Sequence, residues 1–113
     1  MIIMPEMIAY PDFEKLDIRV GTIKEAKPHP NADKLIILKL DEGKEELRQL
    51  VAGIKEHYKE KELVGKQVVF LANLEPRPLR GEMSNGMILA ADAEGKPVLL
   101  IPEKKVPNNT KIK

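Results

Sequence analysis

The sequence predicts an all-β domain built as a five-stranded Greek-key barrel, with one short helix between its third and fourth strands and an extension at each end. Two observations lead to this prediction. Short apolar runs of strand length recur along the 113 residues, and clusters of Gly, Pro, Asn and Asp separate them, as is typical of turns between strands. Only one segment between two such runs has helical character, and this order of elements favours a barrel over a β-sandwich.

The first half of the chain supplies three of the predicted strands. Residues 17–26 alternate apolar and polar side chains, and Gly21 breaks the alternation as a β-bulge or a tight barrel corner would. Residues 35–40, LIILKL, follow a turn-rich segment and form the second strand. Residues 48–52 form a short third strand, which Gly53 ends.

The second half supplies the helix and the remaining strands. Helical character lies within residues 54–65, where Gly65 provides the C-terminal stop. The remaining strands are predicted at residues 68–73, 87–92 and 98–101. Because this order matches the oligonucleotide-binding (OB) fold, we predict a single OB-fold domain over residues 1–113.

Residues 1–12 form an apolar N-terminal arm. Its apolar side chains include Met1, Ile2, Ile3, Met4, Met7 and Ile8. These side chains need cover from water, and we expect a partner subunit to provide it, so that the arm is a homodimer interface. Pro11 at a first helical position predicts one helical turn that ends at Lys15, with Phe13 and Leu16 packed on the core.

The composition limits the location and the chemistry of the protein. The arm lacks the basic leader and the cleavage site of a signal peptide, and no later apolar run is long enough to span a bilayer. The absence of cysteine fits a reducing cytoplasm and excludes disulfides, thiolate metal sites and cysteine nucleophiles. With only two histidines, a histidine-rich metal site is excluded as well. We expect a cytoplasmic protein with no membrane contact, metal or cofactor.

Catalysis is not expected, because the sequence contains no nucleophile–base pair, metal cluster or phosphate-binding glycine loop. The net charge is +1, so the chain as a whole exerts little long-range attraction on nucleic acid. A nucleic-acid binder with this charge must gather its basic side chains on one face.

The turn between the fourth and fifth predicted strands is suited to holding a polar ligand. Pro76 and Pro78 each remove a backbone donor and fix φ, so Arg77 lies in a stiff, extended segment. We expect Arg77 and Arg80 to point outward. Residues 84–86, SNG, then supply a hydroxyl, an amide and a position that another backbone or a base can approach closely.

Six blocks of the sequence occur in the order found in a family of tRNA-binding domains. From about residue 13 to residue 113, the chain resembles the tRNA-binding domain appended to methionyl-tRNA synthetases. Related proteins carry this domain too, namely those similar to endothelial monocyte-activating polypeptide and small free-standing tRNA-binding proteins. The blocks are LDIRVGTI at 16–23, HPNADKL at 29–35, VAGI at 51–54, ELVGK at 62–66, NLEPRPLRG at 73–81 and SNGMILAA at 84–91. The ending VPNNTKIK resembles the family's terminal segment, so we expect a complete module.

The resemblance implies a non-catalytic OB-fold module that recognises the shape of tRNA and dimerises through segments outside the barrel. The free-standing form is often described as the beta subunit of methionyl-tRNA synthetase, so the catalytic subunit of that enzyme is an expected partner. An assignment as methionine–tRNA ligase would then come through this partner. Because such a module raises the local concentration of tRNA near the catalytic subunit, modest affinity is sufficient.

The motifs and the chemistry of their side chains define the candidate site. Lys34, Arg77 and Arg80 can contact phosphates. Amides and hydroxyls can bind the 2′-hydroxyls or base edges that distinguish RNA from DNA, and Met87 offers an apolar contact to an unstacked base. The complete set of predicted tRNA-binding residues is Asn31, Lys34, Asn73, Arg77, Arg80, Ser84, Asn85 and Met87.

Structural roles are alternatives for several of these residues. Asn73 can hydrogen-bond across its turn, as asparagine commonly does in loops. Arg77 and Arg80 can pair with Glu75 or Glu82, which would reduce their availability. Met87 begins an apolar strand and can belong partly to the core, while His29 and His57 are expected in a turn and on the surface, respectively.

The chain departs from its relatives at the arginine-rich turn. Many relatives read PRKMRG there, whereas this chain reads EPRPLRG, with Glu75 and Pro78. We therefore predict weaker phosphate contact and greater dependence on RNA shape than in the more basic relatives. The scarcity of aromatic residues also argues against a stacking platform for single strands.

Two other functions remain open from the sequence. The first is a peptide-binding secretion chaperone built on the same dimeric barrel, whose members resemble this chain at DFEKLDIR and at residues 107–112. Those relatives typically lack the ADKL and S-x-GM blocks found here at 32–35 and 84–87. The second is a scaffold that dimerises a synthetase without contacting RNA, because the apolar arm would serve that role equally well.

Overall fold

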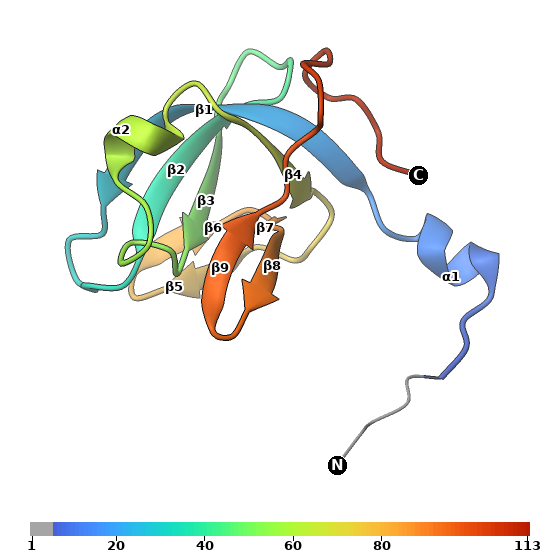
Figure 1. Ribbon diagram of the computed structural model, residues 1–113, viewed down its shortest axis with the longest axis horizontal. Coiled ribbons are helices and arrows are strands. Elements are labelled where there is room, and N and C mark those ends of the chain that lie inside the picture. Colours follow the sequence, from blue (N-terminus) through green and yellow to red (C-terminus); the bar gives the residue numbers. More distant parts are fainter. Residues whose placement is uncertain (1–5) are drawn as a thin grey trace.

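The computed structural model describes residues 6–113 and contains an antiparallel sheet of five strands that curls into a nearly closed barrel (Figure 1). The strands are β1 (Ile18–Pro28), β2 (Ile36–Asp41), β3 (Arg48–Ala52), β4 (Gln67–Leu71) and β7 (Met87–Ile88). Their order in the sheet is β3-β2-β1-β4-β7, and β3 lies next to β7 at the seam. The predicted all-β barrel is confirmed.

The long strand β1 organises the barrel because it pairs with two partners. Its first half, from Ile18 to Thr22, pairs with β4, and its second half pairs with β2. Between the strands lies a core of fully buried side chains, each of which contributes about 1.5–3 kcal/mol when it leaves water. The largest are Phe70, Ile23, Ile36, Leu38, Leu40, Leu50 and Leu63.

The break predicted at Gly21 has a packing cause, and the β-bulge lies nearby. The β1–β2 register shifts between Ile23 and Glu25, so the extra residue is Lys24. A Cβ atom at Gly21 would lie 3.1 Å from the ring of Phe70 and 3.2 Å from the carbonyl oxygen of Asp41. Glycine is therefore needed at Gly21 for close approach within the barrel.

The predicted helix is confirmed in place, and it is short. Helix α2 spans Glu60–Leu63 between β3 and β4, and buries Leu63. Residues 55–57 form a single turn instead, which is closed by the N–H groups of His57 and Tyr58 on the carbonyl of Ile54. Gly65 follows the helix with φ of 92°, a conformation that ends helices.

The continuous fifth strand predicted at 87–92 is wrong, because the chain leaves the barrel at Leu89. Strand β7 stops at Ile88, and Ala90–Ala93 forms β8, which pairs with β9 (Lys96–Leu99) in a separate hairpin. The N–H of Leu89 binds the carbonyl of Val69, while the carbonyl of Leu89 accepts the N–H of Leu100. These bonds attach the β8–β9 hairpin to β4.

The segment between β4 and β7 contains a second small hairpin. It consists of β5 (Arg77–Leu79) and β6 (Glu82–Ser84), which pair with each other in antiparallel fashion. The sequence predicted a stiff, extended segment there and no hairpin. The backbone between the two prolines is extended, as expected, and its pairing partner is β6.

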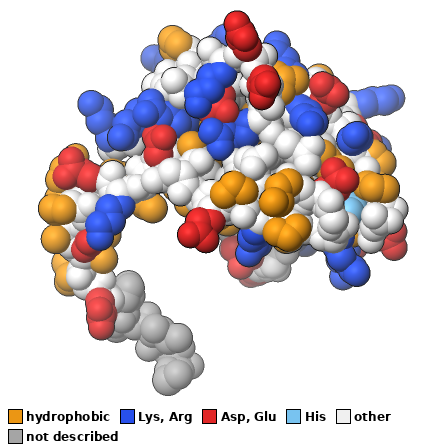
Figure 2. Space-filling model, turned by 180° about the vertical axis from the view of Figure 1, so that it is seen from behind, with side chains coloured by type: hydrophobic (Ala, Val, Ile, Leu, Met, Phe, Trp, Pro, Cys, Tyr) orange, Lys and Arg blue, Asp and Glu red, His pale blue; other side chains and the backbone are white. Residues whose placement is uncertain are grey.

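The N-terminal helix α1 (Tyr10–Glu14) stands away from the barrel (Figure 1). It begins with Pro11 in its first turn, as predicted. The expected packing of Phe13 and Leu16 on the core is wrong, because α1 buries no residue and Leu16 is 40% exposed. Apolar side chains line this arm in the space-filling view (Figure 2). The part of the predicted dimer arm at 1–5 lies outside the described residues.

The C-terminal segment returns along the first half of β1. The N–H of Asn109 binds the carbonyl of Val20 at 2.7 Å, and the N–H of Ile112 binds the carbonyl of Ile18 at 2.8 Å. An isolated antiparallel bridge joins Arg19 and Lys111. The predicted C-terminal extension therefore covers an edge that β1 would otherwise leave open.

Candidate nucleic-acid interface

The β5–β6 hairpin presents a cation at its tip. Leu79 pairs with Glu82, so only Arg80 and Gly81 form the turn. Both have positive φ, 55° and 94°, which is the type I′ geometry that matches the twist of two antiparallel strands. The side chain of Arg80 is exposed there. Arginine rarely adopts this conformation, so the turn holds Arg80 in a strained backbone.

The hairpin is attached to the outside of β3. The hydroxyl of Ser84 accepts the N–H of Val51 at 3.0 Å, and the side-chain amide of Gln49 donates to the carbonyl of Met83 at 2.9 Å. Strand β6 lies against β3 along this contact. The hairpin is therefore a fixed part of the barrel surface.

The buried ring of His29 joins this hairpin to the loop between β1 and β2. His29 is only 6% exposed. Its Nδ1 accepts the N–H of Asn31 at 2.9 Å, so the proton resides on Nε2, which donates to the carbonyl of Leu79 at 2.9 Å. The sequence indicated only a turn residue at this position. The structure shows a side chain that brings two predicted regions of the site together.

Asn31 and Lys34 lie in the loop that His29 holds. Both side chains are exposed. A hydrogen bond from the N–H of His29 to the carbonyl of Leu35 closes the loop. A second hydrogen bond, from the N–H of Lys55 to the carbonyl of Lys34, attaches the loop to the segment after β3. The backbone of the loop is thus fixed while these two side chains face solvent.

Arg77, Arg80, Met87 and Asn73 are the other exposed residues of the predicted set. Within residues 6–113, neither arginine forms an ion pair, so the predicted alternative pairing with Glu75 or Glu82 does not occur there. Met87 lies on β7 and is 45% exposed. Both arginines are therefore available to bind phosphate, and Met87 offers an apolar surface.

Ser84 and Asn85 form the junction between the hairpin and β7. The Ser84 hydroxyl accepts the N–H of Val51 and donates to the carbonyl of Gly86 at 2.9 Å. Ser84 is only 3% exposed. Gly86 has φ of 126°, and a Cβ atom there would lie 2.6 Å from the carbonyl oxygen of Leu71. The Ser84 side chain supports this tight junction from within, while Asn85 is half-buried.

The side chain of Asn73 connects the start of the loop to the segment before β1. Its Oδ1 accepts the N–H of Asp17 at 2.8 Å, and its Nδ2 donates to the carbonyl of Lys15 at 2.7 Å. This is a bridge between distant segments and not a bond across the turn. The amide oxygen and one N–H of the amide are therefore bound to backbone groups.

Arg48 and Glu42 hold the ends of the loop, and sequence reasoning missed both. The two side chains form a bidentate ion pair, with Nε–Oε2 and Nη2–Oε1 distances of 2.6 and 3.1 Å. The remaining nitrogen of Arg48 donates to the carbonyls of Ala72 and Asn85, which begin and end the loop. The guanidinium also lies 5.4 Å from the ring centroid of Phe70. Arg48 at the start of an apolar strand was the only signal, and it does not identify these partners.

Among residues 6–113, no group of three His, Cys, Asp or Glu side chains is placed to hold a metal ion. In the same part of the chain, no helix has both the length and the apolar character needed to cross a bilayer.

Comparison with known proteins identifies relatives of two kinds. The chain is 54% identical over 108 residues to the methionine–tRNA ligase of Pyrococcus horikoshii; the match covers 96% of this chain and 15% of that protein. The chain thus spans only 14–16% of the length of the curated relatives that it matches. It also resembles the solved structure of a MetRS-related protein from the same organism, with a TM-score of 0.89 and 33% identity, covering 96% of this chain and 100% of that one.

A chaperone shares the same architecture. The crystal structure of chaperone CsaA from Bacillus anthracis matches with a TM-score of 0.86 and 34% identity, over 96% of this chain and 100% of that chain.

The family model described as "Putative tRNA binding domain" matches residues 18–111, which include every predicted site residue. The chain therefore belongs to this family of tRNA-binding domains.

Proposed function

We propose that the protein is a non-catalytic tRNA-binding module that recognises the shape of folded tRNA and delivers it to a methionyl-tRNA synthetase. The observation that carries this proposal is the bond between His29 and Leu79, which places the Asn31 and Lys34 loop beside the hairpin of Arg77 and Arg80. One end of the barrel thereby gathers three cations that form no ion pair within residues 6–113. Such a surface can bind phosphates even though the net charge is only +1.

The predicted residues divide into two groups in this proposal. Asn31, Lys34, Arg77, Arg80 and Met87 contact RNA: they are exposed, as Asn73 also is, and their side chains form no hydrogen bond or ion pair within residues 6–113. The remaining residues, Asn73, Ser84 and Asn85, shape the loop; the side chains of Asn73 and Ser84 are bound to the protein itself. A fixed loop loses little conformational freedom when the RNA binds, which favours recognition of one RNA shape.

We further propose that the protein works in the cytoplasm as a homodimer and associates with the catalytic subunit of the synthetase. The exposed apolar side chains of the arm support the dimer: Met7, Ile8 and Tyr10 are 96%, 67% and 66% exposed. A hydrophobic segment this exposed needs a partner. Methionine–tRNA ligase relatives that contain a similar domain support the association with a synthetase.

A peptide-binding chaperone is the second candidate, and the likeness to chaperone CsaA favours it. In that function the apolar arm would serve a dimer that holds peptides. A scaffold that dimerises a synthetase without RNA is the third. Neither the chaperone nor the scaffold needs the exposed arginines of the β5–β6 hairpin. Substitution of these arginines therefore distinguishes both functions from tRNA binding.

The test is a fluorescence titration with folded tRNA and with an unstructured RNA of equal length, for the unmodified protein and for Arg77→Ala. We expect tighter binding of folded tRNA, and a several-fold loss of affinity in Arg77→Ala. Lys96→Ala is the matched control, because it removes one exposed cation from the β8–β9 hairpin, which contains none of the predicted site residues. Equal weakening in both variants would indicate a general charge effect. Absence of binding to either RNA would overturn the proposal and favour the chaperone or the scaffold.

A further inference from the structure

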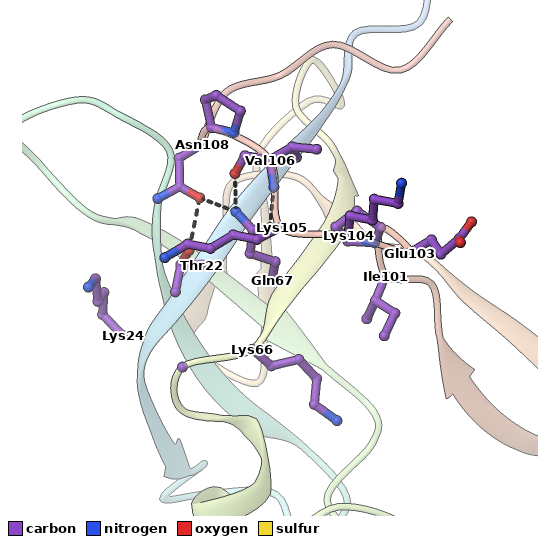
Figure 3. A pocket seen from close by; sticks show the side chains of 13 residues that line it. Thr22, Lys24, Lys66, Gln67, Ile101, Glu103, Lys104, Lys105, Val106 and Asn108 are labelled. Carbon is purple, nitrogen blue, oxygen red and sulfur yellow. Dashed lines mark hydrogen bonds between the residues drawn. The ribbon is translucent and has the colours of Figure 1, made fainter.

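A second basic surface lies away from the candidate interface, where the C-terminal segment crosses β1 and β4. It is a groove of about 600 Å³ between the start of β4 and residues 101–108 (Figure 3). Four lysines line it: Lys24, Lys66, Lys104 and Lys105. The one acidic side chain of the lining is Glu103, so the groove is strongly positive although the chain is nearly neutral overall.

A hydrogen-bond network fixes the floor of the groove. The Gln67 side chain donates to the carbonyl of Val106 at 2.6 Å and to Oδ1 of Asn108 at 3.1 Å, and its own oxygen accepts the N–H of Val106. The hydroxyl of Thr22 also donates to Oδ1 of Asn108, at 2.8 Å (Figure 3). Because these polar groups satisfy one another, the floor keeps its shape without a ligand.

The lysines of the rim remain available for an external anion. None of the four forms an ion pair within residues 6–113. Lys24, Lys104 and Lys105 are exposed, whereas Lys66 is half-buried with its Nζ 5.4 Å from the ring centroid of Tyr58. In Figure 3 the four side chains point in different directions around the groove and do not converge on one point. This spacing suits a chain of negative charges better than a single anion.

We propose that this lysine groove is a second contact for the phosphate backbone of the RNA that binds at the hairpin site. The inference rests on the proposed tRNA binding and extends it to the side of the barrel. It also gives a source of phosphate contacts beyond the arginine turn, where Glu75 adds a negative charge two positions before Arg77.

The two surfaces are joined by β1. Lys24 lies in the middle of this strand, and the strand ends immediately before His29. The five steps from Lys24 to His29 span about 16 Å in an extended strand. Lys27, also exposed, lies between them and forms no ion pair within residues 6–113. One RNA can therefore run along β1 from the groove to the loop of Asn31 and Lys34, past Lys27 and the one exposed acidic residue of this stretch, Glu25.

The salt dependence of tRNA affinity tests this contact. For the double variant Lys24→Ala, Lys105→Ala, the slope of log affinity against log salt should decrease by about 1.4–1.8, since each lost phosphate contact contributes about 0.7–0.9. The matched control is Lys61→Ala, Lys96→Ala, which removes two exposed lysines that do not line the groove. Lys24→Arg, Lys105→Arg keeps both charges and should keep the slope of the unmodified protein.

A footprint supplies the second measurement. Lysines of the full chain are acetylated with and without saturating tRNA, and we expect at least threefold protection of Lys24 and Lys105, with Lys96 as the unprotected reference. Equal slopes in the two alanine pairs, or no protection, would overturn the groove contact. If polyglutamate protects Lys24 and Lys105 from acetylation and tRNA does not, the groove binds acidic peptides, and the proposed RNA contact is overturned.

The outcomes distinguish this inference from the proposed function. If Arg77→Ala weakens tRNA binding and the groove variants do not, the hairpin site stands and the groove contact fails. If the unmodified protein binds no tRNA at all, both fail together. A melting curve for each variant ensures that a change in slope does not come from unfolding.

Discussion

The ring of His29 and the carbonyl of Leu79, 50 positions apart in the sequence, are joined by a hydrogen bond of 2.9 Å. The same ring accepts the N–H of Asn31 through its other nitrogen. One buried side chain thus sets the distance between the two loops that carry the candidate RNA contacts. The geometry of the candidate interface therefore depends on this buried side chain.

Replacement of His29 should weaken both the fold and the interface. We expect His29→Ala to lower the free energy of unfolding by about 1–3 kcal/mol, because the N–H of Asn31 and the carbonyl of Leu79 lose their partner. The dissociation constant for tRNA should rise as the two loops separate. Urea unfolding and tRNA titration measure the two effects. His57→Ala, at an exposed histidine, should change neither; a stable His29→Ala protein with normal tRNA affinity would contradict this role.

Arg80 should show opposite effects on stability and on binding. Its φ of 55° is a conformation that asparagine adopts more readily than arginine. We expect Arg80→Asn to raise the free energy of unfolding by up to about 1 kcal/mol, while tRNA binding weakens with the loss of the cation. Arg80→Lys should keep most of the tRNA affinity without the gain in stability. Unchanged affinity in Arg80→Asn would remove Arg80 from the interface.

The ion pair of Glu42 and Arg48 should be needed as a unit. The side chains of Glu42 and Arg48 are only 5% and 17% exposed. Removal of Glu42 leaves Arg48 without a counterion, and removal of Arg48 leaves Glu42 with only the exposed Lys44, 3.6 Å away. We expect Arg48→Met to cost about 3 kcal/mol of unfolding free energy, and to weaken tRNA binding because Ala72 and Asn85 lose their shared donor. A double-mutant cycle with Glu42→Leu measures the coupling. Strictly additive losses would show that the pair does not act together.

The apolar arm should control the oligomeric state. A chain that begins at Phe13 lacks the exposed Met7, Ile8 and Tyr10 and should sediment as a monomer, whereas the full chain should sediment as a dimer at micromolar concentration. Sedimentation of both forms decides this. A monomeric full-length protein would refute the dimer, and a dimeric shortened protein would move the interface to another surface.

Much of the fold and part of the interface follow from local sequence. The apolar runs of β2 and β3 and the stop at Gly65 have local causes, namely side-chain burial and backbone conformation, so their patterns locate these elements directly. The exposure of Arg77 and Arg80 follows from prolines that stiffen the segment. These features depend on neighbours in the chain and can be predicted from it.

Only the tertiary structure decided the rest, because it depends on partners far away in the sequence. The Ser84 hydroxyl looks equally suited to a ligand until Val51, 33 positions away, takes its hydrogen bond. The division of the fifth strand depends on bonds from Leu89 to Val69 and Leu100. The sequence by itself determined which segments form strands and which side chains could bind RNA; long-range packing determined which of those side chains remain free to do so.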